Sequence, residues 1–365
     1  MATVRVENLR KNFGRIAALK QLSFQVADGE FLCLLGPPGA GKTTTLRLIA
    51  GLEKPDAGEV YLDDLPMSPV MPQERDVAMV FEDVALYPHF SGYDNLAHPL
   101  KLRRLPREEI EAKVRAVAEM LHISHLLNRL PGTYSGGERR RVAIGRALVR
   151  RPRALLLDQP LTDLDARIRQ EMTAELKRLQ RETGQTMIYA THDYEEAVTM
   201  ADRILVMKEG AGEQLGGPEE IYEQPQSAYV ASLVGSPAMN LLPCRAQWDD
   251  HRVQVYHAAF ELRLPAPSAP PPSEDVLLGI RPEHVVMAPA DEREGIPTTI
   301  EIIQPLGKDH IVELKLKDGT RLKFVGRSDI ELTRGMPILV RLPLEHVMLF
   351  DAATGRRIGT QVGAL

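Results

Sequence analysis

The segment "GPPGAGKTT" (36–44) constrains the fold of this chain more than any other. It follows the apolar run "FLCLLG" (31–36) and matches the pattern G-x-x-x-x-G-K-[ST]. Its glycines let backbone N–H groups close around phosphate oxygens, and a helix beginning near Gly41 adds positive potential at its N-terminus. A chance Gly/Pro turn carrying a lysine is the alternative, but it explains neither the strand before the segment nor the helix after it. We call 36–44 the phosphate loop.

The phosphate loop and one distant acid supply the expected ligand contacts. Lys42 is expected to reach the terminal phosphates, and the Thr43 hydroxyl to bind Mg²⁺. Asp158 ends the apolar run "ALLLD" (154–158) and is expected to provide a second metal contact. The nucleotide-binding residues predicted from the loop are Gly36, Pro37, Gly39, Ala40, Gly41, Lys42, Thr43 and Thr44.

The first 235 residues alternate between short apolar runs and amphipathic stretches. Near-continuous apolar runs suit strands covered on both faces, and strand–helix alternation is typical of a mostly parallel α/β domain. The expected strands are 30–36, 77–81, 154–158, 186–190 and 203–208, and the expected helices include 107–123 and 164–182.

The pattern changes near "VGSPAMNLLP" (234–243) to short alternating runs. Strands are expected within 252–257, 310–326 and 336–342, with "DGT" (318–320) as a hairpin turn. The Pro-rich stretch 265–275 is expected to be an exposed loop. Residues 1–235 and 236–365 are therefore predicted to be two domains, the second one all-β.

Composition limits the class of protein. A formal net charge of −5 argues against binding to nucleic acid. The sequence contains no apolar run of the roughly 18–20 residues that span a bilayer, and its first residues lack an apolar signal core. Two cysteines, Cys33 and Cys244, do not suggest a disulfide framework. We expect a soluble chain in a reducing cytoplasm.

A second anion-binding motif lies in "YSGGERRRVAIGRAL" (134–148), which we call the signature segment. Its Ser-Gly-Gly opens a basic helix, and helix N-termini bind anions. Because the chain already has a phosphate loop, Ser135, Gly136, Gly137 and Glu138 are expected to contact a γ-phosphate held by a second copy in a head-to-tail dimer. A solvated basic helix face is the alternative.

These motifs, in this order, resemble the ATP-binding-cassette (ABC) ATPases, specifically the sugar- and polyol-importer type related to the maltose-importer ATPase. The segments "AMVFEDVALYPHFSGYDNLAHPL", "YATHDYEEAVTMADRILVM", "GSPAMNLLP" and "GIRPEH" carry the resemblance beyond the phosphate loop. It covers essentially the whole chain. It implies a P-loop, RecA-like nucleotide-binding domain with a helical subdomain at about 85–150, and a C-terminal OB-like regulatory domain.

The resemblance also implies roles for single residues. Phe13 would stack on adenine, with core packing as the alternative. His192 would contact the γ-phosphate and orient water, and Asp165 would lie at the dimer seam. The region Glu82–Phe90 would receive a short helix from an integral membrane subunit. ATP and Mg²⁺ are the implied ligands; the implied partners are permease subunits, a second cassette and a solute-binding protein, at the cytoplasmic face of the membrane.

Two positions depart from the family pattern. Glu82 stands where the family usually carries Gln, and Gln159 stands where it usually carries the Glu that polarises water. An amide cannot take a proton, and loss of a general base costs about 10²–10⁴ in rate. We therefore expect tight ATP binding and slow hydrolysis. The catalytic group is predicted to be Gln159, His192 and Glu82, with Glu82 also a metal ligand beside Thr43 and Asp158.

Three explanations for Gln159 remain open in the sequence. In the first, Gln159 is an introduced change that traps ATP. In the second, the chain contributes a weak site to a mixed pair with a second ATPase. In the third, Glu82 replaces the missing base. The leading functional hypothesis is the ATPase subunit of an importer. The alternatives are a soluble ATPase of the same superfamily and a regulatory protein in which nucleotide is a switch ligand.

Overall fold

The computed structural model describes residues 2–162, 164–248, 252–265, 273–288, 295–327 and 329–359. The chain forms two compact units, Met1–Pro218 and Glu219–Leu365. The segment between 219 and 235, which the sequence analysis assigns to the first domain, belongs to the second unit by this division. Residues 266–272, most of the expected Pro-rich loop, lie outside the described residues.

The first unit is built on one ten-stranded sheet with the order β5-β4-β1-β2-β10-β9-β3-β8-β7-β6. Its central strands β9, β3, β8, β7 and β6 pair in parallel, whereas β1, β2, β4 and β5 form an antiparallel extension. The strands are β1 (Val4–Phe13), β2 (Ile16–Val26), β3 (Phe31–Leu35), β4 (Ala57–Leu62), β5 (Leu65–Pro66), β6 (Val77–Val80), β7 (Ala154–Asp158), β8 (Thr186–Thr191), β9 (Arg203–Lys208) and β10 (Ala211–Gly216).

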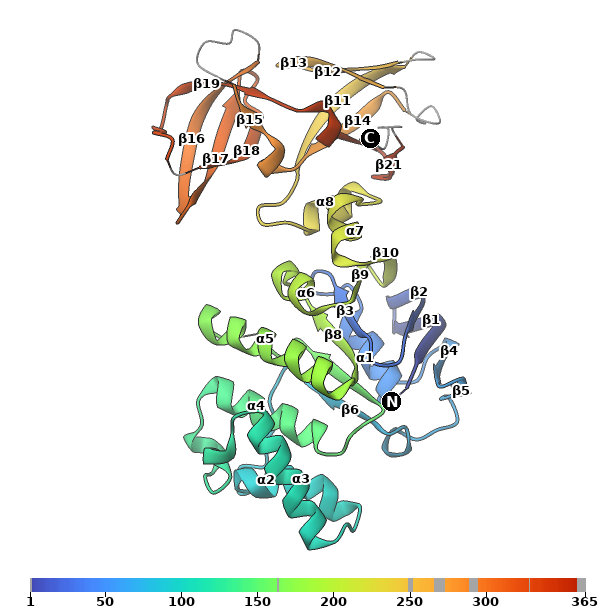
Figure 1. Cartoon of the computed structure of the whole chain (residues 1–365). Helices are drawn as coiled ribbons and strands as arrows, with labels where there is room; N and C mark the ends of the chain where they lie inside the picture. Colours follow the sequence, from blue (N-terminus) through green and yellow to red (C-terminus); the bar gives the residue numbers. More distant parts are fainter. Residues whose placement is uncertain are drawn as a thin grey trace. The chain divides into compact units, whose positions relative to one another are not determined.

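Helices and 3₁₀ turns complete the first unit. Figure 1 shows α2, α3 and α4 gathered in a helical lobe away from the antiparallel strands, within the span predicted for the helical subdomain. The elements are α1 (Lys42–Ala50), η1 (Pro72–Glu74), α2 (Gly92–Leu102), α3 (Arg107–Met120), η2 (Ser124–Leu126), η3 (Pro131–Thr133), α4 (Gly136–Leu148), α5 (Ala166–Thr183) and α6 (Tyr194–Met200).

Burial explains why the apolar runs become the central strands. Every residue of β3, β7 and β8 is buried, as expected for parallel strands covered on both faces. The predicted mostly parallel α/β domain is confirmed. The polar residues that follow these strands are consequently brought to one edge of the sheet.

The second unit is mainly β. Two antiparallel sheets, with orders β13-β12-β11-β14-β20-β21 and β15-β19-β16-β17-β18, share one apolar core. The expected turn at 318–320 joins β17 to β18, and Gly319 adopts the φ of +93° that favours glycine. The elements are α7 (Pro218–Glu223), α8 (Ala228–Leu233), β11 (Asn240–Trp248), β12 (Arg252–His257), β13 (Phe260–Pro265), β14 (Asp275–Ile280), η4 (Pro282–His284), β15 (Val286–Met287), β16 (Ile296–Leu306), β17 (Asp309–Leu316), β18 (Arg321–Arg327), β19 (Pro337–Arg341), η5 (Leu344–His346), β20 (Met348–Asp351) and β21 (Arg357–Ile358).

A buried arginine fixes the start of the second unit to its sheets. Arg281 is 2% exposed, and its guanidinium lies over the Tyr222 ring at 3.9 Å. It donates to the backbone carbonyls of Tyr222, at 2.7 Å, and Val234. A buried cation needs such partners because desolvation is costly. Arg281 therefore anchors the 219–235 segment to the β unit.

We predict that Arg281→Met lowers the free energy of unfolding of the second unit by about 3 kcal/mol, because hydrogen bonds from a buried charged group are lost. Trp248, the one tryptophan in the chain, lies in β11 and reports on this unit by fluorescence during urea unfolding. The matched control is Arg245→Met, since the Arg245 side chain is 78% exposed and pairs with Asp275 at the surface. Equal urea unfolding midpoints for the two variants would contradict the anchoring role of Arg281.

Candidate nucleotide site

Four neighbouring parallel strands bring the predicted site residues to one sheet edge. The phosphate loop follows β3, His192 follows β8, Asp158 ends β7, and Glu82 lies two residues beyond β6. These strands are adjacent in the order β3-β8-β7-β6. Ligands of open α/β sheets bind at the carboxyl ends of the strands. The edge therefore assembles residues that are widely separated in the sequence.

The phosphate loop presents an uncapped helix start. Gly41 is the N-cap of α1, with φ of +101° and without a side-chain cap, so the first N–H groups of the helix have no partner from it. A Cβ on Gly41 would lie 2.7 Å from Leu19 Cδ2 and 2.8 Å from the Ala18 carbonyl oxygen. Both the dihedral angle and the space require glycine there. The geometry fits an anion at the N-terminus of α1.

Lys42 places a cation inside this loop. It is 4% exposed, and its Nζ donates to the carbonyl oxygens of Gly36 at 2.6 Å and Pro37 at 3.0 Å. Burial lowers the pKa of Lys42, and the nearby Asp158 carboxylate opposes that shift. The ammonium is thus held among the backbone carbonyls of its own loop rather than extended into solvent.

Thr43 and Asp158 form an oxygen pair across the sheet edge. The Thr43 hydroxyl donates to Asp158 Oδ1 at 3.0 Å. Burial raises the pKa of Asp158, the Thr43 hydrogen bond lowers it, and the Glu82 charge raises it. Hydroxyl and carboxylate oxygens are ligands that Mg²⁺ prefers, and adjacent ligands of an octahedral Mg²⁺ lie about 3 Å apart. The donor set and its spacing fit this metal.

Gln159 is held in an uncommon backbone conformation. Its φ is 45°, in the left-handed region that bulky residues rarely adopt, and its N–H donates to the Ala190 carbonyl oxygen at 2.9 Å. The His192 Nδ1 donates to Gln159 Oε1 at 2.9 Å. The amide Nε2 donates to Glu82 Oε2 at 3.4 Å. Gln159 therefore bridges the imidazole and the carboxylate.

This bridge needs an amide. An ionised Glu at 159 could only accept hydrogen bonds and would face the Glu82 carboxylate, so two like charges would meet. Glu82 and Gln159 are therefore a matched pair. With Nδ1 of His192 donating to Gln159, the ring's Nε2 accepts a hydrogen bond when neutral and donates one when protonated.

The polar groups at the start of the signature segment form hydrogen bonds within their own chain. Ser135 is the N-cap of α4: its hydroxyl accepts from the Glu138 N–H at 3.2 Å, and Glu138 Oε2 accepts from the Ser135 N–H at 2.7 Å. His125 lies 3.0 Å from the other Glu138 oxygen. A Cβ on Gly137 would lie 2.9 Å from Ile168, so α4 packs closely against α5 there. Ser135 and Gly136 are exposed.

Two other predicted residues lie on separate elements. Phe13 ends β1 and is 44% exposed, with Lys11 Nζ 5.1 Å from its ring centre, so it is not packed in the core. Asp165 is the N-cap of α5 and accepts from the Ile168 N–H at 3.0 Å. That cap gives Asp165 a structural role in its own chain, beside the dimer-seam role that stays a prediction.

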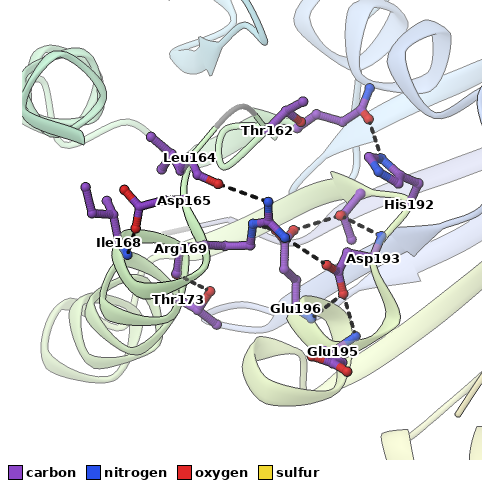
Figure 2. Close-up of polar contacts among 12 residues, drawn as sticks. Thr162, Leu164, Asp165, Ile168, Arg169, Thr173, His192, Asp193, Glu195 and Glu196 are labelled. Carbon is purple, nitrogen blue, oxygen red and sulfur yellow. Dashed lines mark hydrogen bonds and ion pairs between the residues drawn. The ribbon is translucent and has the colours of Figure 1, made fainter. Parts of the chain in front are cut away.

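Two arginines near the site were not among the predicted residues. Arg140 on α4 is buried and donates to the Glu82 carbonyl oxygen at 2.6 Å. Arg169 on α5 donates to the Leu164 carbonyl oxygen at 3.0 Å and faces Asp193 at 3.6 Å, as Figure 2 shows. The position of Arg140, three residues after Gly137 on the apolar face of α4, is a signal that the sequence analysis did not use.

Comparisons with known proteins identify the family of this chain. Residues 19–162 match the ABC transporter family, 235–285 match the MalK OB fold domain, and 278–350 match the TOBE domain. The trehalose/maltose import ATP-binding protein MalK of Thermococcus litoralis is 44% identical, over 98% of this chain and the whole relative. The chain belongs to the ABC transporter ATPases. The sn-glycerol-3-phosphate import ATP-binding protein UgpC of Cereibacter sphaeroides is 42% identical, over 98% of this ABC ATPase and the whole relative.

Solved structures match about three fifths of this ABC ATPase. One is cbiO1 from Clostridium perfringens, part of the ABC transporter complex cbiONQ, at 32% identity, TM-score 0.57, 60% of this chain and 89% of the other. Another is a dimeric ATP-binding cassette in a post-hydrolysis state bound to ADP and Pi, at 32% identity, TM-score 0.54, 59% of this chain and 98% of the other. The family binds nucleotide, and the P-loop fold prediction is confirmed.

A hollow of about 460 Å³ lies beside the nucleotide edge of this ABC ATPase. It is lined by β6, Phe81, the segment 83–87, α2 and α4. The Tyr87 ring lies 5.1 Å from that of Phe90 and 5.0 Å from that of His98. Arg146 donates to the Ala85 carbonyl oxygen at 2.7 Å. Residues lining it include Phe81, Leu86, Tyr87, His98, Leu102 and Arg146.

We predict that Lys42→Ala reduces Mg²⁺-ATP affinity by at least about a hundredfold, because a buried charge-assisted contact to phosphate is lost. Fluorescent-nucleotide titration measures the change. Lys20→Ala is the control, since Lys20 is an exposed lysine paired with Glu209. Unchanged affinity in the Lys42 variant would refute the phosphate-loop assignment.

Proposed function

We propose that this ABC ATPase is the ATP-binding subunit of an importer for a sugar, a polyol or a related solute. The observation that carries the proposal is the union in one chain of the Gly41–Thr43–Asp158 site and a C-terminal unit matching the MalK OB fold domain. The named relatives, which import trehalose/maltose and sn-glycerol-3-phosphate, support it. The solute contacts other subunits, so its identity within this class is left open.

In the proposed mechanism the α1 N-terminus and Lys42 hold the ATP phosphates. Thr43, Asp158 and Glu82 would hold Mg²⁺, which supplies positive charge for the developing phosphate oxygens. His192 and Gln159 orient the attacking water. Gln159 accepts and donates hydrogen bonds but takes no proton, so it positions the water without acting as a base.

The proposed active form is a head-to-tail dimer. Ser135 and Gly136 are exposed at the start of α4, and Ser135 would lie within hydrogen-bond distance of the γ-phosphate held by the second copy. The dimeric solved cassette supports this arrangement. Closing on ATP and reopening after hydrolysis would drive the membrane subunits.

The proposed docking site for the membrane subunits is the hollow beside the 82–90 region. Its aromatic and aliphatic lining suits the apolar face of a short helix. Among the described residues, no helix is long and apolar enough to cross a membrane. We propose that the chain is bound at the cytoplasmic face through these permease subunits, with a solute-binding protein completing the system.

A second candidate function keeps nucleotide as a switch ligand. The observation that favours it is the amide at 159, which contacts His192 but cannot take a proton, while Lys42 lies within the phosphate loop. In that case the β unit would bind regulatory partners and turnover would be incidental. The following two experiments separate the candidates.

We predict that Leu86→Glu lowers co-purification of the tagged full chain with polytopic membrane proteins by at least about tenfold. A charge in place of an apolar anchor removes a contact worth about 2 kcal/mol. Mg²⁺-ATP affinity should stay unchanged. Quantitative mass spectrometry of solubilised native membranes measures the partners.

The control for that experiment is Leu130→Glu, because Leu130 is exposed on the same lobe but does not line the hollow. Retention of the membrane proteins by the Leu86 variant would argue against this docking site. Their absence from the wild-type sample would favour the switch function.

We predict that Gln159→Glu with Glu82→Gln raises ATP turnover by roughly 10²-fold, because a general base is restored without a facing carboxylate. Gln159→Glu alone should gain less, since two acids would then stand where the 3.4 Å amide contact now lies. Single-turnover phosphate release measures both rates. Glu82→Gln alone is the matched control.

Each other outcome selects an explanation for Gln159. Flat turnover in Gln159→Glu, together with loss of residual activity in Glu82→Gln, would identify Glu82 as the base. Activity that appears only on mixing with a second ATPase subunit would favour the mixed pair.

A further inference from the structure

One buried guanidinium contacts two separate loops of the nucleotide site. Arg140 is 5% exposed on α4. Its Nη1 donates to the carbonyl oxygens of Glu82 at 2.6 Å and Phe81 at 3.3 Å, and its Nη2 donates to that of Thr162 at 3.4 Å. The first two carbonyls follow β6, and the third belongs to the loop after β7, between Asp158 and α5.

These two loops carry the matched pair. Glu82 lies in the first loop and Gln159 in the second, and their side chains meet at 3.4 Å. Arg140 donates to backbone carbonyls of both loops that make this contact. A shift of either loop would therefore strain both the side-chain contact and the arginine contacts.

Arginine suits this position for a geometric reason. Its planar guanidinium carries five N–H donors in a fixed fork, so one side chain can serve carbonyls from two loops. A lysine donates from one point, and a shorter glutamine offers one NH₂ group. The burial of the charge is tolerated because these carbonyls replace lost water.

The same helix begins at the signature serine. Ser135 caps α4, and Arg140 lies five residues later, about 7.5 Å along a rigid helix. Any displacement of the α4 start is thus passed to Arg140 and to both loops. In the proposed dimer, Ser135 serves the second copy's nucleotide, whereas Glu82 and Gln159 serve this chain's own.

The loop after β7 is also held from its other side. Arg169 donates to the Leu164 carbonyl oxygen and faces Asp193 and Glu196 at 3.6 and 3.8 Å (Figure 2). The loop is therefore fixed between α4 and the turn that carries His192.

We propose that Arg140 is a positioning residue that links the signature helix to the Glu82 and Gln159 loops, so that engagement of one nucleotide site aligns the other. The link between loops stands on this chain's own contacts. The coupling between sites rests on the proposed function, because it requires the dimer.

The first test uses hydrogen exchange of the nucleotide-free full chain. Arg140→Gln should speed exchange at least about tenfold in peptides covering 81–86 and the loop after β7, because their shared anchor is lost. The Gln159 N–H, which donates to Ala190, lies in the second peptide. Arg139→Gln is the matched control, since Arg139 is the exposed neighbour on the same helix.

A conservative variant separates positioning from a general loss of structure. Arg140→Lys can keep the short contact to the Glu82 carbonyl oxygen but not the one to Thr162. Exchange should then rise in the loop after β7 and stay near wild type in 81–86. Melting temperatures identify any variant that fails to fold. If Arg140→Gln does not fold, the exchange pattern of Arg140→Lys alone tests the proposal. Wild-type exchange in both peptides of the Arg140 variants would overturn the proposal.

The second test adds Mg²⁺-ATP to the same samples. In the wild type, exchange should slow in the phosphate loop, the α4 start and both anchored loops. In Arg140→Gln, protection should remain in the phosphate loop and be lost, by at least about tenfold, in the 81–86 peptide. Full protection there would overturn the coupling. If ATP does not slow exchange in the wild-type phosphate loop, the proposed function is refuted. The nucleotide-free test of the link between the two loops is not affected by that outcome.

Discussion

The hydrogen bond from Thr43 to Asp158 joins two segments 115 residues apart and defines the site. It forms only because β3, β8 and β7 are parallel neighbours whose carboxyl ends share one edge. The phosphate loop, the acid that ends β7 and the histidine after β8 all depend on that order. The buried aliphatic strands thus fix positions at the edge that no local sequence preference could fix.

The chemistry at this edge is set by pairs rather than by single residues. Lys42 lies among the carbonyls of its own loop, Asp158 accepts from Thr43, and Gln159 links His192 to Glu82. Glu82 and Gln159 are complementary, because the Gln159 amide can donate a hydrogen bond to the Glu82 carboxylate, whereas a second acid would repel it. The amide at 159 therefore keeps the imidazole, the amide and the carboxylate in one connected network.

Local patterns predicted much of this arrangement and missed what depends on tertiary contacts. The glycines, Lys42 and Asp158 follow from a motif flanked by a strand and a helix, and the fully buried strands follow from continuous apolar runs. Arg140 was missed because three consecutive arginines indicate a solvated face, while burial depends on loops 58 and 22 residues away. The segment 219–235 depends likewise on Arg281, which is distant in sequence.

The reciprocal cap at Ser135 and Glu138 has a consequence for association. A hydroxyl oxygen that accepts from an N–H still has its own hydrogen to donate. Ser135 can thus donate a hydrogen bond to an incoming anion while it still caps α4, and its oxygen is already fixed in place. In the proposed dimer, recognition there would begin from an ordered surface, so little rotational freedom would remain to be lost when two copies close. The Glu138 carboxylate is fixed in the same way, because one oxygen accepts from the Ser135 N–H and the other lies 3.0 Å from His125 Nε2.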